Sequence, residues 1–194
     1  MSSPYDSTAL EKELSKTLTG KRYVHSLAVA QTCLLLQKQY KLTCDEKELY
    51  QCGLMHDLAR DWSAQKLIAY ADEHSLALEV EEESTPVLLH APVGACLLAD
   101  RGFSEEVCTA VRYHTIGSIH MGIMGLVLYV ADYIEPNRMH LSDGDRDALM
   151  HEPTLESLCL QIVKAEHIHL HAKGKVVTHS GMELYQWLVQ GGRF

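Results

Sequence analysis

The segment Gly53-Leu54-Met55-His56-Asp57-Leu58-Ala59-Arg60 places a histidine and an aspartate side by side in a stretch that is otherwise largely apolar. Four further residues of these two types lie in, or at the end of, segments with an apolar helical face: His25, His90, His114 and Asp132. Imidazole and carboxylate groups are costly to bury unless a partner compensates them. A divalent-metal site with nitrogen and oxygen ligands would compensate all six together.

Each of these residues also has a structural interpretation. A single inward-facing histidine is more often a hydrogen-bonded core residue than a ligand. Asp57 could be a buried salt-bridge partner, and Asp132 could cap the next turn. Because every buried residue would then need its own partner in an apolar setting, six such residues are explained more economically by one shared centre. Their positions therefore favour metal binding.

The composition is that of a globular protein, with 46% hydrophobic and 22% charged residues. No apolar run approaches the roughly 20 residues that span a bilayer. Met1–Leu10 has neither a basic region nor an apolar core, so we expect no signal peptide and a cytoplasmic location. The formal net charge of −9 argues against a nucleic-acid partner but leaves a small phosphorylated substrate open. The six cysteines include no C-x-x-C pair, which favours buried free thiols over a redox or zinc motif.

Apolar residues recur at helical spacing along the chain, and no pattern of paired strands interrupts them. The sequence therefore predicts an all-α protein. The expected helices lie near residues 7–18, 20–40, 45–60, 63–73, 85–101, 104–114, 121–135, 143–150, 153–172 and 180–190.

Several short motifs mark where these helices should begin. Capping-box spacing predicts helix starts at Thr8, Thr43 and Ser180, and Ser104 precedes two glutamates that suit a first turn. Gly117 is expected to stop the helix that ends near His114. The acidic run 79–83 is interpreted as a solvated loop or helix end.

Two metal ions are a natural arrangement for six such ligands. A carboxylate such as Asp57 can bridge two ions about 3.5–4 Å apart. His25, His56 and Asp132 would complete the first ion, with His90 and His114 on the second. Mixed nitrogen and oxygen ligands suit iron, manganese or zinc without choosing between them.

The order H…HD…D matches the HD-domain superfamily of metal-dependent phosphohydrolases, which is named for the adjacent pair. Five longer strings strengthen the resemblance, and together they resemble the bacterial YqeK family of symmetrical bis(5′-nucleosyl)-tetraphosphatases over roughly residues 18–140. These strings occupy residues 22–27, 53–60, 89–95, 112–117 and 129–138. At one position the chain departs from the superfamily, since Arg60 stands where a lysine is common.

The resemblance implies one HD-type domain over residues 1–194, a helical bundle with a dinuclear metal site at its centre. Its core would span about 18–140, with helices of about 143–194 packed on it. The implied reaction is cleavage of diadenosine tetraphosphate into two ADP by metal-activated water, with two divalent ions as cofactors, iron first among them. Hydrolysis of another phosphoester and non-catalytic nucleotide binding remain the alternatives.

The remaining site residues are expected around the phosphates. Asp57 and Arg60 are the expected catalytic residues, and Arg60, one turn after His56, should neutralise phosphate charge. Further substrate contacts are expected from Arg112, Thr115, Gly117, Asn137 and Arg138. Surface salt bridges are the alternative for the other two arginines, and helix termination is the alternative for Thr115 and Gly117.

Two features lie beyond the family strings. His167, His169 and His171 sit near the end of an expected helix, where the helix dipole favours them, and we expect a structural role rather than a second metal site. Leu184 and Trp187 are expected to pack in the core or to bury a homodimer contact. A small nucleotide is the expected ligand, with neither a nucleic acid nor a membrane as partner.

Overall fold

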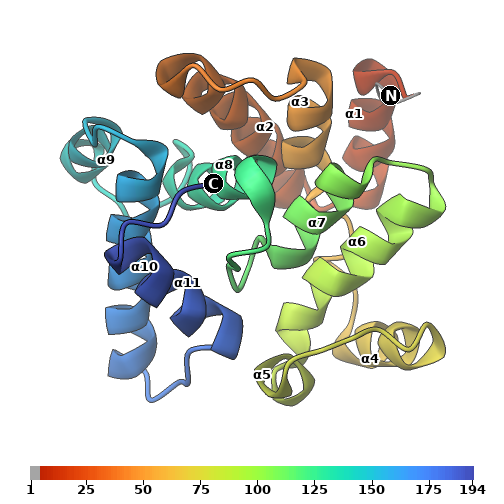
Figure 1. Cartoon of the computed structure of the whole chain (residues 1–194). Helices are drawn as coiled ribbons and strands as arrows, with labels where there is room; N and C mark the ends of the chain where they lie inside the picture. The colour runs from red at the N-terminus through yellow and green to blue at the C-terminus, as the bar shows by residue number, and fades with distance from the viewer. Residues whose placement is uncertain (1–4) are drawn as a thin grey trace.

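The computed structural model describes residues 5–194, and every regular element in that part of the chain is a helix (Figure 1). Residues 1–4, which belong to the expected domain and to the Met1–Leu10 segment, lie outside the described residues. The all-α prediction is confirmed. The elements are α1 (Ser7–Thr17), α2 (Gly20–Tyr40), α3 (Glu46–Met55), α4 (Ala64–Glu73), α5 (Val80–Ser84), the 3-10 helix η1 (Pro86–Leu89), α6 (His90–Asp100), α7 (Glu105–Tyr113), α8 (Gly122–Ile134), α9 (Asp143–Met150), α10 (Leu155–Ala172) and α11 (His179–Val189).

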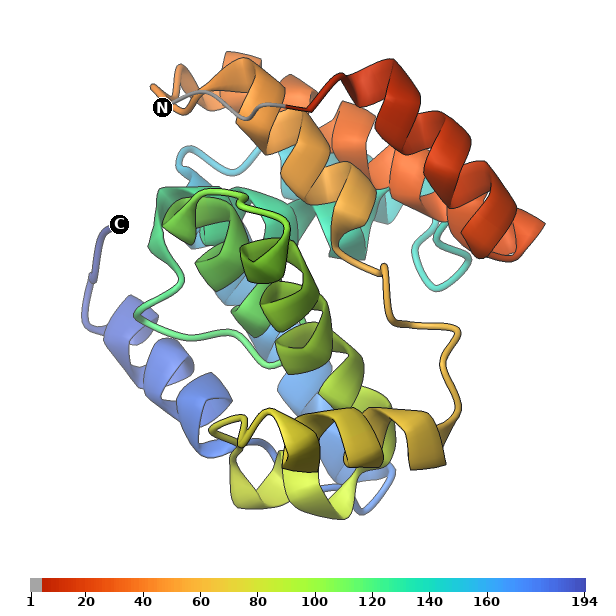
Figure 2. The same cartoon turned by 90° about the vertical axis from the view of Figure 1, so that its right-hand side faces the viewer.

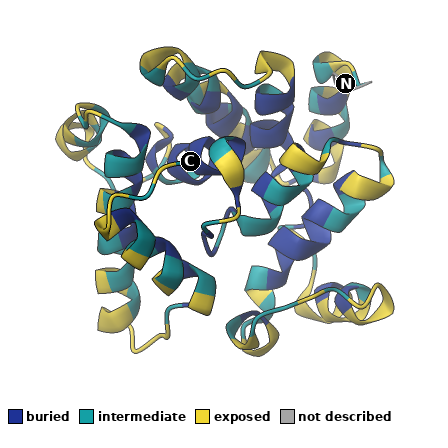
Figure 3. Cartoon of the chain, viewed as in Figure 1, coloured by how far each residue is buried: buried dark blue, intermediate teal, exposed yellow. Residues whose placement is uncertain are grey.

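Helix α8 lies at the centre of the bundle. It is the most uniformly apolar helix, and α2, α3, α7 and α10 all contact it. Figure 3 shows it almost wholly buried, and the turned view in Figure 2 shows α1–α3 layered across one end of the molecule. One hydrophobic core includes Leu14 of α1, Leu128 of α8 and Leu184 of α11. The C-terminal helices therefore share the core of the others, and the single-domain boundary stays a prediction that this packing supports.

Three predicted helix starts were wrong by two residues. Asp6, Asp45 and Thr178 cap α1, α3 and α11, where Thr8, Thr43 and Ser180 were expected. The capping residues have extended backbone angles, which the first residue outside a helix requires. The prediction for Ser104 is confirmed, since its hydroxyl accepts the amide of Val107. Gly117 has a positive φ of 70° and follows α7 as expected.

Two predicted helices are interrupted beside the central histidines. The helix expected over 45–60 ends at Met55, and residues 56–62 continue as turns with amide bonds to the carbonyl three residues before. The helix expected over 85–101 is divided into η1 and α6, and His90 begins the second part. Both breaks place a site histidine at a helix end.

The acidic run is a structural element rather than a solvated loop. It forms α5, in which Glu82 is fully buried and accepts both terminal guanidinium nitrogens of Arg112, at 2.6 and 2.7 Å. Glu79 accepts the hydroxyl and amide of Ser180, at the start of α11. These contacts hold the segment before His90 against α7 and α11.

Two further observations concern cysteines and membranes. All six cysteines are free, and Cys33, Cys52 and Cys159 are buried. Within residues 5–194, no helix combines the length and the apolar character that crossing a membrane would require.

The crossing of α2 and α3 depends on Gly53. A methyl group added at this position would lie 2.7 Å from the Cα of Ala30 and 3.0 Å from its nitrogen, and both of these are backbone atoms. We predict that Gly53→Ala lowers the free energy of unfolding by about 1–3 kcal/mol, because the two backbones must separate.

The control is Gly20→Ala at the start of α2, where nothing lies within 4 Å of the added methyl group. Urea unfolding should show that this variant is unchanged or slightly more stable. Equal stability of both variants would contradict the close approach at Gly53.

Candidate metal centre

Six side chains from five separate segments converge at one point of the bundle. His25 comes from α2 and Asp132 from α8, while His56 and Asp57 follow α3 directly. His90 begins α6, and His114 follows the last residue of α7. The four histidines and Asp57 are buried, and Asp132 is partly exposed. The structure thus brings together all six residues proposed as ligands.

The two oxygens of Asp57 face different histidines. Its Oδ1 lies 3.2 Å from Nε2 of His90 and 3.7 Å from Nε2 of His114. Its Oδ2 lies 3.4 Å from Nε2 of His56 and 3.7 Å from Nε2 of His25. A carboxylate that bridges two ions must present its oxygens to two ligand groups in this way.

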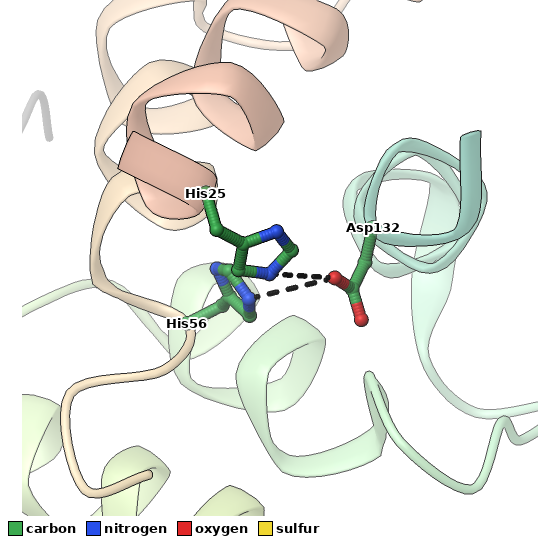
Figure 4. Close-up of side chains that lie close together, drawn as sticks. All are labelled: His25, His56 and Asp132. Carbon is green, nitrogen blue, oxygen red and sulfur yellow. Dashed lines mark ion pairs between the residues drawn. The ribbon is translucent and has the colours of Figure 1, made fainter. Parts of the chain in front are cut away.

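Asp132 closes the cluster from the side of α8. Its Oδ1 lies 3.0 Å from Nε2 of His25 and 3.7 Å from Nε2 of His56, and Figure 4 shows both rings turned toward this carboxylate. Ligand atoms of these three residues lie within 4.8 Å of one another, and so do those of His56, Asp57 and His114. Two overlapping groups that could each hold a cation therefore share His56.

Three of the imidazoles are oriented by the same local bond. Nδ1 of His56, His90 and His114 lies 2.5–2.7 Å from the carbonyl oxygen three residues before it. Carbonyls at the end of a helix lack the amide partner four residues later, which leaves a lone pair available to a ring at that position. The helix breaks at these histidines thus fix the direction of each ring.

The fourth imidazole uses a side chain instead. Nδ1 of His25 lies 3.1 Å from Oε1 of Glu135, which is 1% exposed. Carbonyl oxygens only accept, and a carboxylate at this position accepts as well, so Nδ1 carries the proton in all four rings. In the neutral form, such a ring presents the lone pair of Nε2 to the centre, which is the form that binds metals.

This donor set fits a divalent metal. Nε2 of His25 and of His56 are buried and make no hydrogen bond to the residues that the structure describes. Nε2 of His90 and of His114 lie 3.2 Å apart, a spacing at which two lone pairs repel. Two nitrogens bound to the same ion at about 2.1 Å each would have this separation. A cation would therefore satisfy atoms that the protein leaves unsatisfied.

The electrostatics of the cluster favour positive charge at its centre. Burial alone would raise the pKa of Asp57, but its contacts with His56, His114 and His90 hold that pKa well below its usual range. Burial likewise opposes ionisation of Asp132, yet its contacts with His25 and His56 and the charge of Arg138 lower its pKa. Burial lowers the pKa of His90 despite its contact with Asp57. Both carboxylates stay ionised and require cationic partners.

Sequence reasoning did not single out Arg22 and Glu135 as site residues. Nη1 of Arg22 lies 2.7 Å from Oδ2 of Asp57, and Glu135 fixes His25 as described. Their spacing was the available signal, because Arg22 precedes His25 by three residues and Glu135 follows Asp132 by three, one helical turn in each case.

A cavity of about 1020 Å³ opens onto this centre. Of the expected substrate contacts, Arg60, Thr115 and Arg138 line it. The hydroxyl of Thr115 is buried without a hydrogen-bond partner among the described residues. The guanidinium of Arg138 contacts the side chain and backbone carbonyl of Asp132.

The other expected contacts do not line the cavity. Arg112 is held by Glu82, the amide of Gly117 bonds to the carbonyl of Tyr113, and the amide of Asn137 donates to Oε2 of Glu135 at 2.7 Å. Their substrate contacts stay predictions. His167 and His169 line the cavity, whereas His171 does not.

Glu135 provides a direct test of the oriented imidazole. We predict that Glu135→Gln weakens metal binding by about 10–100-fold, because His25 loses the carboxylate that fixes its ring and tautomer. Competition with a chelator of known affinity measures the effect. Glu73→Gln, an exposed residue of α4, is the control and should bind metal as the wild type does. An unchanged affinity in Glu135→Gln would show that His25 needs no such partner.

Comparisons with known proteins agree with this geometry. The HD domain family matches residues 22–137. The symmetrical bis(5′-nucleosyl)-tetraphosphatase of Bacillus subtilis (strain 168) is 31% identical over 180 residues, which cover 92% of this chain and 95% of that protein. The protein of that name from Staphylococcus aureus (strain NCTC 8325 / PS 47) is 31% identical over 176 residues, 89% of either chain.

The fold is also found in a solved structure. The crystal structure of a predicted HD superfamily hydrolase involved in NAD metabolism, from Clostridium acetobutylicum, has a TM-score of 0.84 and 28% identity, and the match covers 96% of this chain and 98% of that one. HD domain hydrolases bind divalent metals, and the clusters described above could hold one. The chain therefore belongs to the HD domain family, in the branch that contains the symmetrical bis(5′-nucleosyl)-tetraphosphatases.

Proposed function

We propose that the chain is a metal-dependent hydrolase that cleaves diadenosine tetraphosphate symmetrically into two ADP. The observation that carries the proposal is the set of four Nε2 atoms directed at two carboxylates, the buried Asp57 and the partly exposed Asp132, on the wall of a large cavity. Relatives that share about a third of the sequence over most of its length bear the name of this activity. The cavity volume is at the upper end of the range for small-molecule sites.

We propose two divalent ions at this centre. His25, His56, Asp57 and Asp132 would hold one, and Asp57, His90 and His114 the other. Iron is the proposed metal, with manganese or zinc as alternatives for the same donors. Divalent ions at such a site activate water near neutral pH and withdraw charge from phosphoryl oxygens.

Arg60 is the proposed phosphate-binding residue. Three arginines line the cavity, and two of them already contact carboxylates, Arg22 with Asp57 and Arg138 with Asp132. The guanidinium of Arg60 makes no ion pair with the described part of the chain and is partly exposed. Its planar fork can accept two oxygens of one phosphate. Arg60 would thus neutralise charge as it develops on the polyphosphate.

The other residues of the site hold the substrate and the ligands in place. The unpartnered hydroxyl of Thr115 is available to a phosphate or ribose oxygen. Arg22 compensates the charge of Asp57 from the side opposite His90 and His114, through Oδ2 rather than Oδ1. Asp57 therefore stays ionised and fixed in direction, and this is its proposed role in catalysis.

The cellular setting belongs to the same proposal. A cytoplasmic location fits six free cysteines and a nucleotide substrate.

Leu184 is fully buried within the chain's own core, and Trp187 contacts Phe194. A homodimer stays a prediction, and these two side chains have partners without it.

Product analysis tests the reaction directly. We expect metal-loaded protein to convert diadenosine tetraphosphate into ADP alone, and in ¹⁸O-labelled water one of each two ADP molecules should carry the label. AMP together with ATP would contradict symmetrical cleavage. Formation of ADP by chelator-treated protein would contradict metal dependence.

Arg60 variants test the phosphate contact. Arg60→Ala should lower kcat/KM by about 100-fold, the usual cost of losing one group that stabilises transition-state charge. Arg60→Lys should recover part of this loss, because it keeps the charge without the fork. Arg193→Ala removes an exposed arginine far along the chain and serves as the control. Equal activity of Arg60→Ala and the control would exclude the proposed contact.

A further inference from the structure

The cavity extends well beyond the proposed metal ligands. Its far side is formed by the last turns of α10 and the segment that follows, which contribute Glu166, His167, His169, Leu170, Lys175 and Val176. We refer to these six residues as the α10 wall. All of them lie outside residues 22–137, the part of the chain that the HD domain matches. Figure 1 shows α10 and α11 on one side of α8 and α5 and α6 on the other.

The charges of the two sides of the cavity differ. Arg22 and Arg60 lie on the side that carries Asp57. The α10 wall has a single cation, Lys175, and a carboxyl group, Glu166, whose pKa burial raises to about 7. Burial lowers the pKa of His167, so its imidazole is neutral at pH 7. The wall is therefore not built to bind a polyanion.

The groups on the wall suit a nucleoside instead. Imidazole rings offer flat faces and hydrogen-bonding nitrogens, and Leu170 and Val176 add apolar surface beside them. The ring of His167 is held by Tyr185 of α11, with centroids 5.3 Å apart and planes at 55°. Stacking on such rings accepts any base, because every base has a π face.

The wall is fixed relative to the metal centre. Oε2 of Glu166 accepts the hydroxyl of Tyr129 on α8, and Tyr129 precedes Asp132 by three residues, about one turn. This hydrogen bond fixes the position of α10 relative to α8, the helix that carries the proposed ligand Asp132. His171 belongs to the same histidine run but does not line the cavity. His167 and His169 line it because of their positions on α10.

We propose that the α10 wall binds the nucleoside of one of the two ADP halves of the substrate. The proposal rests on the proposed function in that a dinucleoside polyphosphate occupies the cavity. The polyphosphate then lies along the arginine side, and one base stacks against His167 and His169. The wall thereby distinguishes a dinucleoside from a polyphosphate that lacks nucleosides.

The test compares two ligands of the metal-loaded protein by calorimetry. One is diadenosine tetraphosphate with a methylene group in place of the central bridging oxygen, and the other is inorganic tetraphosphate. His167→Ala/His169→Ala should weaken binding of the dinucleoside by about tenfold, the scale of lost base stacking. Its affinity for inorganic tetraphosphate should change much less. His171→Ala is the matched control and should leave unchanged the ratio of the dissociation constant for the dinucleoside to that for inorganic tetraphosphate.

A second variant tests the proposal independently, in case the double histidine variant misfolds. Val176 is 75% exposed, so Val176→Trp should fold normally while obstructing the wall, and it should raise the same ratio. Equal losses for both ligands, or no loss in either variant, would overturn the proposal.

The two proposals fail separately. If wild type releases only ADP but the ratio is unaffected by both variants, the α10 wall does not bind the nucleoside and the proposed function stands. If wild type hydrolyses no diadenosine tetraphosphate yet the ratio rises in both variants, the proposed function is wrong and the α10 wall still binds nucleosides.

Discussion

The contact between the buried Asp57 carboxylate and the imidazoles around it joins α2, α6, α7 and the turn after α3. A carboxylate that is 3% exposed would be strongly destabilising without positive charge beside it. Arg22 supplies one such charge at 2.7 Å on a single oxygen, and Oδ1 faces only imidazoles. A divalent cation between these groups would satisfy the carboxylate and the free nitrogens at once. The bundle therefore packs around a polar centre whose residues could hold a metal ion.

This centre explains where the helices end. His56, His90 and His114 stand at helix boundaries, where each ring reaches a carbonyl three residues before it. A histidine inside a continuous helix would find that carbonyl already bonded to the chain. Helices therefore begin or end at these three histidines, and each of the three rings is held with Nε2 toward the centre. The substrate cavity opens beside these same breaks.

The helices and the six proposed ligands could be predicted because both follow from local patterns. Apolar spacing identified most helices, and the inward face of each helix identified a histidine or aspartate on it. Partners distant in sequence left no such pattern. Glu135 meets His25 across 110 residues, and Glu82 is buried because Arg112 reaches it from 30 residues away, so both look like ordinary surface acids in the sequence. The cap errors at α1, α3 and α11 arose because two suitable side chains lie within two residues of each other, and backbone geometry decides between them.

The number of metal ions per chain tests the account most directly. Plasma mass spectrometry of anaerobically purified protein should find two ions per chain in wild type, about one in His90→Ala, and close to none in Asp57→Ala. Among the described residues, only the carboxylate of Asp57 faces both the His25–His56 pair and the His90–His114 pair. Two ions retained in Asp57→Ala, or a single ion in wild type at saturating metal, would contradict a centre in which Asp57 bridges two metals.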